Sequence, residues 1–345
     1  MKVLVTGAGG FLGSSLVKKL LEMGETDIRC FIRRESHAKN LIRLGEGFPG
    51  ATVEVYKGNL TSRADVEEAV MGIEVIYHCA AALKGSPSDM FFNTVVASKN
   101  LLDSIRMKGI KRIVLVSSFS VYGVATLPRK SWVNEMTGLE AHPEKRDPYT
   151  YVKTKQEKLF WDYHDRFGIP LVVIRPGVIY GSGGVSLPGR VGVPLPGVFL
   201  HLGNGNPLPL THVENCAEAI VLAGRTPGIV GEVFNIHDDD LPTSREYLRY
   251  YKKKVRPIFS LWIPYPIFWG ISYVYKKYVD YSQGQLPDVF TPYKTASVWK
   301  GNRFDNSKAK KTLNWKPSLS IRDGLERYFN SLSSRANSLD DAKQA

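Results

Sequence analysis

Two tyrosine–lysine pairs in the segment DPYTYVKTKQE (147–157) are spaced for acid–base chemistry. Tyr149 precedes Lys153 by four residues and Tyr151 precedes Lys155 by four, so on a helix each pair shares one face. A tyrosine works as an acid or base near neutral pH only if its pKa of about 10 falls by roughly three units, which takes about 4 kcal/mol. A lysine ammonium one turn away, together with a second positive charge nearby, can provide that stabilisation. Either pair could equally be a chance surface pair, and the spacing alone does not choose between them.

A serine upstream is placed to bind the same substrate oxygen. Ser118 follows the apolar segment RIVLVS (112–117), whose composition is typical of a buried strand. A hydroxyl at the end of a strand can donate a hydrogen bond to an oxygen that exchanges a proton with a tyrosine. The residues therefore suggest a Ser–Tyr–Lys set that contains Ser118 and one of the two pairs.

The glycine-rich stretch TGAGGFLG (6–13) lies between a strand pattern and a helix pattern. Residues 1–6 are apolar and β-branched, and residues 11–23 carry apolar side chains at helical spacing. Without side chains, three glycines permit a tight turn, a close approach of backbone N–H groups to a pyrophosphate, and close helix–strand packing. These three positions, Gly7, Gly10 and Gly13, predict a nucleotide-binding loop.

Alternating strand and helix patterns over the first 180 residues predict the fold class. Strand patterns at 27–32, 52–56, 74–79 and 171–174 alternate with helix patterns at 63–71, 90–107 and 149–167. Repeated units of this kind predict an α/β fold with a Rossmann-like, doubly wound parallel sheet and helices on both faces. The stretch 181–209 is rich in Gly and Pro, and we expect loops over a cleft there. We expect a nucleotide-binding domain over 1–180, to which 210–240 returns, a smaller C-terminal substrate-binding region over 181–209 and 241–332, and a frayed tail over 333–345.

The composition is that of an ordinary folded protein with a basic C-terminal part. The 345 residues carry a formal net charge of +13, and 43% of them are hydrophobic. Between 245 and 316, fifteen Lys or Arg residues stand against four acids, so most of the charge lies there. Such a segment attracts the phosphates of a nucleic acid, an anionic lipid or a substrate. Nucleic acid is disfavoured because no binding motif accompanies the charge.

The cysteines and the N-terminus indicate a cytoplasmic protein. Cys30, Cys79 and Cys216 lie far apart in apolar runs and match neither a disulfide framework nor the spacing of a metal site. The N-terminus runs directly into a strand pattern, so we expect no signal peptide, and we expect no bound metal.

Together these segments resemble the extended short-chain dehydrogenase/reductases of the epimerase/dehydratase type. The resemblance covers nearly the whole chain. It is carried by TGAGGFLG (6–13), HCAA (78–81), SSFSVYG (117–123), DPYTYVKTKQE (147–157), RPGVIYG (175–181), THVENCAEAI (211–220), EVFNI (232–236) and LNWKPSLSIRDGL (313–325). The family pattern is Pro-Tyr-x-x-x-Lys with Glu eight residues after the Tyr. Pro148 and Glu157 fit Tyr149 and not Tyr151.

The resemblance implies roles for particular residues. Ser118, Tyr149 and Lys153 would be catalytic, Lys153 would also hold the nicotinamide ribose, and a homodimer is expected as in the family. The cofactor would be contacted by Gly7, Gly10, Phe11, Leu12, Gly13, Arg33, Arg34, Asn59, Leu60, Ala80, Ala81, Tyr149, Lys153 and Pro176. Asn59 stands where the family usually has an Asp that contacts adenine. Thr94, beside Asn93, stands where many members have a structural Asn, and this is a departure from the family pattern.

The end of the second predicted strand bears on which dinucleotide is bound. Members specific for NAD carry an acid there that bonds the ribose hydroxyls, whereas this chain has Arg33 and Arg34, with Glu35 only later. A guanidinium receives a 2′-phosphate in a bidentate manner and a carboxylate would repel it. We therefore favour NADP, while NAD remains the alternative if an arginine only stacks on adenine.

The residues after Ser118 bear on the reaction. Dehydratases of this family carry an Asp-Glu pair there for elimination, whereas this chain has Phe119 and Ser120. This leaves epimerases and simple dehydrogenases or reductases, in which the cofactor exchanges the hydride. A nucleotide sugar is the favoured substrate. One alternative is a 3β-hydroxysteroid- or flavonol-like carbonyl reductase on a lipophilic substrate, and another is a cofactor-binding sensor without turnover, against which the intact Ser–Tyr–Lys set argues.

The segment 252–277, KKKVRPIFSLWIPYPIFWGISYVYKK, combines aromatic residues with basic clusters at both ends. Pro264 and Pro266 argue against a continuous membrane-spanning helix. The segment suits a peripheral anchor on the anionic inner face of a membrane. It also suits a helix that packs inside the substrate-binding region, and the sequence does not decide between the two.

Overall fold

The computed structural model describes residues 1–184, 186–283 and 285–344, with side chains described up to 334. Its centre is a seven-stranded sheet in which every neighbouring pair of strands is parallel. In spatial order the strands are β12 (Glu232–Ile236), β7 (Leu171–Pro176), β5 (Arg112–Val116), β4 (Val75–His78), β1 (Lys2–Thr6), β2 (Asp27–Ile32) and β3 (Thr52–Lys57). The strand order reverses at β1, as in a doubly wound Rossmann-like sheet, and the predicted fold class is confirmed.

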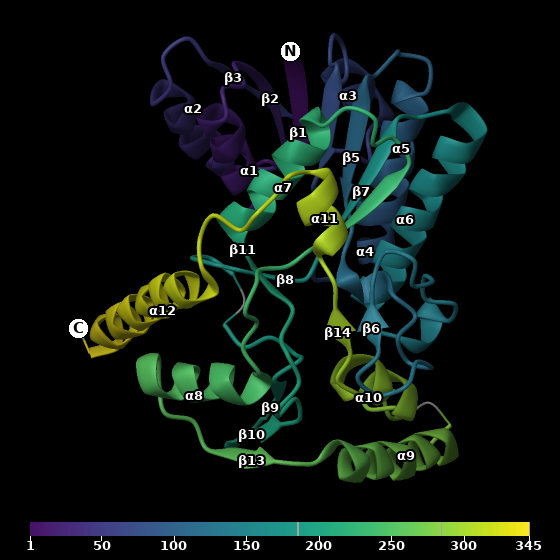
Figure 1. The fold of residues 1–345 in the computed structure, drawn as a ribbon, viewed down its shortest axis with the longest axis vertical. Coiled ribbons are helices and arrows are strands. Elements are labelled where there is room, and N and C mark those ends of the chain that lie inside the picture. The colour runs from purple at the N-terminus through teal and green to yellow at the C-terminus, as the bar shows by residue number, and fades with distance from the viewer. Residues whose placement is uncertain (185, 284, 345) are drawn as a thin grey trace.

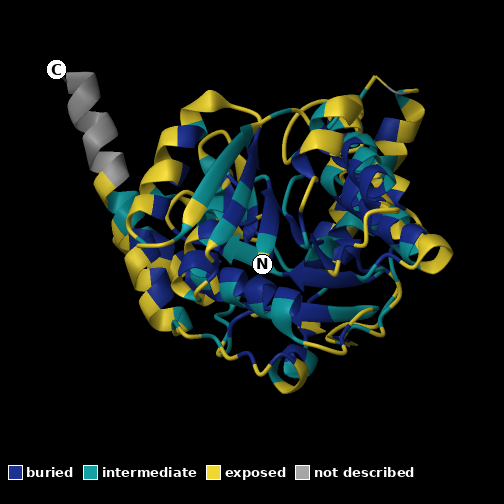
Figure 2. Ribbon diagram, turned by 90° about the horizontal axis from the view of Figure 1, so that it is seen from above, coloured by how far each residue is buried: buried dark blue, intermediate teal, exposed yellow. Residues whose placement is uncertain are grey.

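Helices cover both faces of this sheet (Figure 1). One face carries α1 (Phe11–Glu22), α2 (Ala38–Glu46) and α7 (Val213–Arg225); the other carries α3 (Arg63–Ala69), α5 (Ala97–Ile105) and α6 (Pro148–Phe167). Successive residues of β1 alternate between the two cores, since Val3 and Val5 pack with α1 and α7 while Leu4 packs with α3 and α5. Figure 2 shows the central strands buried between helices whose outer faces are exposed.

Two helices near the site have features that the sequence pattern missed or only partly predicted. The helix expected over 90–107 is divided into α4 (Pro87–Phe91), a five-residue π-helix over Phe92–Val96, and α5. In α6, Asp147 caps the N-terminus by accepting from the Thr150 N–H at 3.0 Å, and Pro148 occupies the first turn. Gly168, with φ of 66°, ends α6 in the left-handed region.

The stretch 181–209 is more regular than the expected loops. It contains β9 (Gly192–Leu195) and β10 (Val198–His201), which form an antiparallel pair that β13 (Ser260–Trp262) extends. Pro196 and Gly197, the latter with φ of 76°, make the two-residue turn between β9 and β10. A Cβ at Gly192 would lie 1.9 Å from the Leu200 carbonyl oxygen, so this pairing requires glycine. The expectation of loops was therefore wrong here, because Gly and Pro mark the turn and the close strand contact.

Most of the remaining elements build the lower part of the molecule in Figure 1, whereas α11 (Ser307–Thr312) packs against the parallel sheet and the turn Glu35–His37 follows β2. The remaining elements are β8 (Val178–Tyr180) with β11 (Leu210–His212), β6 (Trp132–Val133) with β14 (Arg303–Phe304), α8 (Ser244–Lys254), α9 (Tyr265–Tyr281), α10 (Pro292–Trp299), α11 and α12 (Ile321–Gln344), with short 3₁₀ turns at Glu35–His37, Phe119–Val121 and Pro143–Lys145. Ala309, Leu313 and Trp315, inside the stretch 241–332, pack in the core of the parallel sheet rather than below it. The expected frayed tail, 333–345, falls mostly on residues outside those whose side chains are described, and it stays a prediction.

Candidate active site

The carboxyl ends of β1, β2, β4, β5 and β7 surround a cavity of about 930 Å³. In an open parallel sheet this edge, where the strand order reverses, is the usual place for a ligand. Every residue predicted for catalysis or cofactor contact lines this one cavity: Gly7, Gly10, Phe11, Leu12, Gly13, Arg33, Arg34, Asn59, Leu60, Ala80, Ala81, Ser118, Tyr149, Lys153 and Pro176.

The glycine loop forms a cradle that side chains would fill. Gly7 has φ of 72°, and a Cβ at Gly13 would lie 2.1 Å from the Gly7 carbonyl oxygen. The Gly10 N–H donates to that same carbonyl at 2.9 Å, which closes the turn. Gly10 is the N-cap of α1 and no side chain caps this helix, so its first N–H groups face the cavity edge without a side-chain acceptor. The loop therefore fits a dinucleotide pyrophosphate.

Basic side chains gather at the end of β2. Arg33, Arg34 and His37 all line the cavity, and Arg33 donates to the Asn93 side-chain oxygen at 3.2 Å. Glu35 does not line the cavity, and its carboxylate instead pairs with Lys57 at 3.1 Å. The end of this strand therefore offers cations and no carboxylate to the adenosine side of a dinucleotide.

Ser118 and Tyr149 come from different elements and meet in the cavity. Ser118 follows β5 and caps the 3₁₀ turn Phe119–Val121, where its Oγ accepts from the Ser120 N–H at 3.1 Å. Tyr149 lies in the first turn of α6, and its phenol and the Ser118 hydroxyl are hydrogen-bonded. Burial raises the pKa of Tyr149, and the hydrogen bond with Ser118 opposes that rise. The phenol is therefore protonated at neutral pH in this state.

Lys153 lies one turn further along α6 and is buried in a polar network. Its Nζ donates to the Val116 carbonyl at 2.6 Å and to the Gln156 side chain. Burial lowers the pKa of Lys153 to about 8, and the Glu157 carboxylate opposes this shift. The ammonium form therefore still predominates at pH 7, within reach of the cavity.

The network continues from Gln156 to the end of β4. Gln156 Nε2 donates to Ser98 Oγ at 2.8 Å, and Ser98 lies 2.9 Å from His78 Nε2. His78 Nδ1 lies 2.8 Å from Thr6 Oγ1, so the chain of contacts ends on β1. Burial lowers the pKa of His78 to about 3, which keeps this imidazole neutral. The network ties the inner face of α6 to two strands of the sheet.

A buried ion pair fixes α6 against β7. Arg175 Nε donates to the Glu157 carboxylate at 3.1 and 3.2 Å, and Ser117 also donates to that carboxylate. Glu157 and Arg175 are both almost fully buried, and Arg175 also lies over the Tyr122 ring at 4.6 Å. Glu157, which the sequence offers only as part of a motif, therefore holds α6 in place.

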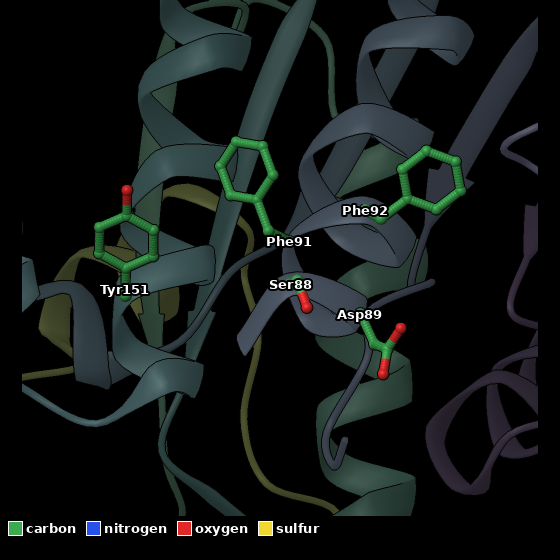
Figure 3. A pocket seen from close by; sticks show the side chains of 5 residues that line it. All are labelled: Ser88, Asp89, Phe91, Phe92 and Tyr151. Atoms are coloured by element: carbon green, nitrogen blue, oxygen red, sulfur yellow. The ribbon is translucent and has the colours of Figure 1, made fainter. Parts of the chain in front are cut away.

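The second tyrosine–lysine pair lies on the outer side of α6. Tyr151 does not line the main cavity; it borders a separate hollow of about 600 Å³ together with Ser88, Asp89, Phe91 and Phe92. Figure 3 shows Phe91 facing Tyr151 across this hollow, and their ring centroids are 6.4 Å apart. Lys155 is exposed and lies 5.6 Å from the Tyr151 ring. The helix turn thus separates the two overlapping copies.

Two departures from the family pattern have structural explanations. Asn59 lines the cavity, and its Oδ1 accepts from the Thr61 N–H at 3.1 Å. Thr94 lies in the π-helix, fully buried, and its Oγ1 accepts from the Ala82 N–H at 3.0 Å. Thr94 thereby anchors the loop after β4, while the half-buried Asn93 accepts from Arg33.

Several lining residues were missed by sequence reasoning. Besides His37, they include Gly9, Thr61, Lys84, Val178, Ile179, Gly183 and Gly184. A Cβ at Gly9 would lie 2.6 Å from the His37 ring, and Gly183 and Gly184 both pack against the Phe11 ring. The run GSGG at 181–184 was a usable signal, because clustered glycines often mark a close approach of backbone to a ligand or ring.

The position after Ser118 supplies no carboxylate. Phe119 is buried and stacks on Phe304, with ring centroids 4.5 Å apart and planes 6° from parallel. Phe119 therefore belongs to the packing beneath the site, in agreement with the absence of the dehydratase Asp-Glu pair.

A doubly wound sheet with a glycine cradle, and a Ser–Tyr–Lys set beside that cradle, defines a class of dinucleotide-binding proteins. The sequence profile of the NAD dependent epimerase/dehydratase family matches residues 3–236. The chain belongs to that family.

Similar proteins are named for different substrates. Mouse sterol-4-alpha-carboxylate 3-dehydrogenase, decarboxylating, is 26% identical over 96% of this chain and 90% of its own length. The uncharacterized UDP-glucose epimerase YtcB of Bacillus subtilis is 28% identical over 97% of this chain and 98% of its own. The structure of a UDP-glucuronic acid 4-epimerase from Bacillus cereus in complex with NAD matches with a TM-score of 0.72 and 22% identity, over 97% of this chain and 99% of that one.

Proposed function

We propose that this chain is an NAD(P)-dependent oxidoreductase that exchanges a hydride with a hydroxyl-bearing carbon, with Ser118, Tyr149 and Lys153 as its catalytic residues. The observation that carries the proposal is their common place in one cavity with the glycine cradle. Gly7, Gly10 and Gly13 would hold the pyrophosphate, and Lys153 would hold the nicotinamide ribose. The cofactor, when bound, accepts or supplies the hydride.

The chain's own residues would bind the substrate oxygen and move its proton. The hydroxyls of Ser118 and Tyr149, which contact each other, would both bond to that oxygen. Because burial keeps the phenol protonated, Tyr149 Oη can donate its proton when a carbonyl is reduced. In the oxidising direction the Lys153 ammonium, with the charge of the oxidised nicotinamide, would stabilise the phenolate that accepts the proton.

The cofactor proposed is NADP rather than NAD. Arg33, Arg34 and His37 line the adenosine side of the cavity, whereas the Glu35 carboxylate forms an ion pair with Lys57. The guanidinium groups of Arg33 and Arg34 would receive a 2′-phosphate. Changing both arginines to Ala should weaken NADP binding by about 2–4 kcal/mol and leave NAD binding nearly unchanged. Titration of both cofactors against both proteins measures this, and a wild-type protein that prefers NAD would contradict the proposal.

For the substrate we propose a lipophilic alcohol or ketone, such as a 3β-hydroxysterol. The segment after β7 lines the cavity with Pro176, Gly177, Val178 and Ile179, which offer no charge to a diphosphate. The full-length similarity to the mouse sterol dehydrogenase supports this class. A nucleotide sugar, which the sequence favoured, is the second candidate, and the similarity to YtcB supports it.

The proposed reaction can be tested with purified protein by following nicotinamide absorbance for net oxidation or reduction, and by separating the products for epimerisation, which returns the hydride and leaves the absorbance unchanged. A panel of 3β-hydroxysterols, their ketones and nucleotide sugars should show turnover with one class. A Tyr149→Phe variant should still bind the cofactor but should no longer form the product that the wild-type protein forms. If the protein binds the cofactor but turns over no compound of the panel, the alternative of a cofactor-binding sensor without turnover would be favoured. The expected homodimer and cytoplasmic location stay predictions.

A further inference from the structure

The exposed apolar side chains of this molecule are concentrated in one segment. Ten of the twenty-three large hydrophobic side chains that are exposed in the described part of the chain lie between 259 and 281. They are Phe259, Leu261, Trp262, Ile267, Trp269, Ile271, Tyr273, Val274, Tyr278 and Tyr281. The segment contains β13 and α9, which follow one another along the lower edge of the molecule in Figure 1, at the end away from the parallel sheet. A cluster of this kind marks an interaction surface.

Helix α9 contacts the rest of the protein along a narrow line. Three of its seventeen residues are buried, Phe268, Ser272 and Val279, and the Phe268 ring packs edge-on against Phe290 and Trp299. Packing inside the substrate-binding region, which the sequence left open as the alternative to a membrane anchor, accounts for this line of buried residues.

A second row of side chains on α9 is apolar and exposed, and packing within the chain does not explain it. Ile267, Ile271, Val274, Tyr278 and Tyr281 recur every three or four residues, so they share one face, and each is between 48% and 83% exposed. Trp269 and Tyr273, stacked with centroids 6.0 Å apart, extend the apolar surface around the helix. Packing within the chain therefore covers only part of α9.

Cations lie at both ends of this apolar surface. Lys253, Lys254 and Arg256 are exposed at the end of α8, before β13, and Lys277 is exposed on the last turns of α9. Lys276 is neutralised by Asp280 and Asp288, at 2.6 and 3.3 Å. Between 252 and 281 six Lys or Arg residues stand against one acid, Asp280.

We infer that the surface formed by 252–281 docks on an anionic lipid bilayer. Tyr and Trp side chains suit the boundary between headgroups and acyl chains, and basic residues beside them attract anionic headgroups. A second copy of the chain is a poorer partner, because both ends of the surface are cationic and either orientation of two α9 helices brings cations together. Among the described residues no helix is long and apolar enough to cross a bilayer, so the contact lies on one leaflet.

Cosedimentation with vesicles tests the inference independently of any enzymatic activity. The wild-type protein should bind vesicles of phosphatidylglycerol, bind vesicles of phosphatidylcholine far less, and lose the difference at high salt. Each basic residue near an anionic surface contributes about a fivefold factor in partitioning, so Lys253→Gln/Arg256→Gln/Lys277→Gln should weaken binding on the order of 100-fold. These side chains are exposed, so the folded protein should be retained.

A matched control removes the same charge elsewhere. Lys39→Gln/Lys108→Gln/Lys158→Gln changes three exposed lysines outside the surface and should leave vesicle binding within a few-fold of wild type. An equal loss in both triple variants would mean that net charge alone drives adsorption, and the inference would fall. A folded wild type that ignores phosphatidylglycerol would also overturn it.

The apolar part of the surface has its own readout. Trp262 and Trp269 should be quenched by brominated phospholipid in phosphatidylglycerol vesicles, and Trp262→Phe/Trp269→Phe should remove that quenching while the buried Trp315 still emits. Ile271→Gln/Val274→Gln should lower vesicle binding at least several-fold. If that variant instead dissociates a wild-type dimer in sedimentation velocity, and wild type does not bind vesicles, a second copy covers the surface and the inference is wrong.

Discussion

The two faces of α6 carry the same short motif in opposite environments. On the inner face Tyr149 and Lys153 line the 930 Å³ cavity, and Lys153 is held by Val116 and Gln156. On the outer face Tyr151 borders a shallow hollow with Phe91, and Lys155 is exposed above its ring. Two residues along a helix correspond to a turn of about 200°, so overlapping copies cannot share a face.

The difference between the faces shows that the spacing of a motif is not enough to assign chemistry. What distinguishes the inner pair is its neighbours: the hydroxyl of Ser118, the glycine cradle, and a buried network that reaches His78 and Thr6. Polar groups removed from water interact more strongly and are held in place, which suits proton transfer. In the outer pair Lys155 is exposed to water, where such interactions are weak.

The largest expected effect separates the two tyrosines. Tyr149→Phe should lower turnover by about 10²–10⁴-fold, the usual contribution of a positioned acid or base. Tyr151→Phe should stay within about threefold of wild type, because its phenol lies outside the cavity. Steady-state kinetics on the substrate identified by the panel, with cofactor binding by titration as the control for folding, measure both. Comparable losses from the two changes would remove the distinction between the faces.

A second pair of variants compares carboxylates on the two faces. Glu157→Gln should destabilise the protein by about 3–5 kcal/mol, because it leaves the buried guanidinium of Arg175 without its counter-charge. Asp162→Asn breaks an exposed pair with Arg166, at 3.1 Å, and should cost less than about 0.5 kcal/mol. Urea denaturation followed by circular dichroism gives both free energies of unfolding. A Glu157→Gln protein as stable as wild type would show that this ion pair does not hold α6.

The smallest expected effect concerns the pH dependence of stability. The folded pKa of Lys153 is about 8, whereas an unfolded lysine has a pKa of about 10.4. Between these values the unfolded chain binds a proton that the folded chain does not, so this residue makes the fold more stable as pH rises. From about pH 8 to about pH 10 wild type should therefore gain about 2 kcal/mol relative to Lys153→Met. The comparison cancels the titration of the buried cysteines, which acts in the opposite direction.

The outer lysine provides the control for that measurement. Lys155→Met removes an exposed lysine from the same helix and is measured alongside as the matched variant. If the free energy of unfolding changes with pH in parallel for wild type, Lys153→Met and Lys155→Met, Lys153 is not buried as an ammonium. The contrast between the two faces of α6 would then lose its electrostatic basis.

Much of the candidate site was predictable because its determinants are local. Gly7, with its positive φ, and Gly13, whose Cβ would overlap the Gly7 carbonyl, have geometric requirements that only glycine meets. The apolar strand segments and the helix periodicities likewise placed Ser118 and Tyr149 at the same edge of the sheet. His37 was missed because it enters the cavity through a 3₁₀ turn that has no periodic signature.

The C-terminal region was less predictable, since its Gly and Pro residues allow several structures. Gly192 and Pro196-Gly197 favour loops by composition, yet they serve the β9–β10 pairing and its turn. Pairing with β13, some sixty residues away, completes that small sheet, and no local pattern specifies such a partner.

By itself the sequence determined the nucleotide-binding loop, the parallel sheet and the membership of a Ser–Tyr–Lys set, because glycine conformation and side-chain periodicity are properties of neighbouring residues. Only the tertiary structure decided that the Glu157 carboxylate pairs with Arg175, and that α9 is covered along one line and exposed along another. Tyr, Trp and Lys are compatible with a core, a cavity or a surface. Their environment is set by contacts between segments far apart in the chain, and these exist only once the fold has formed.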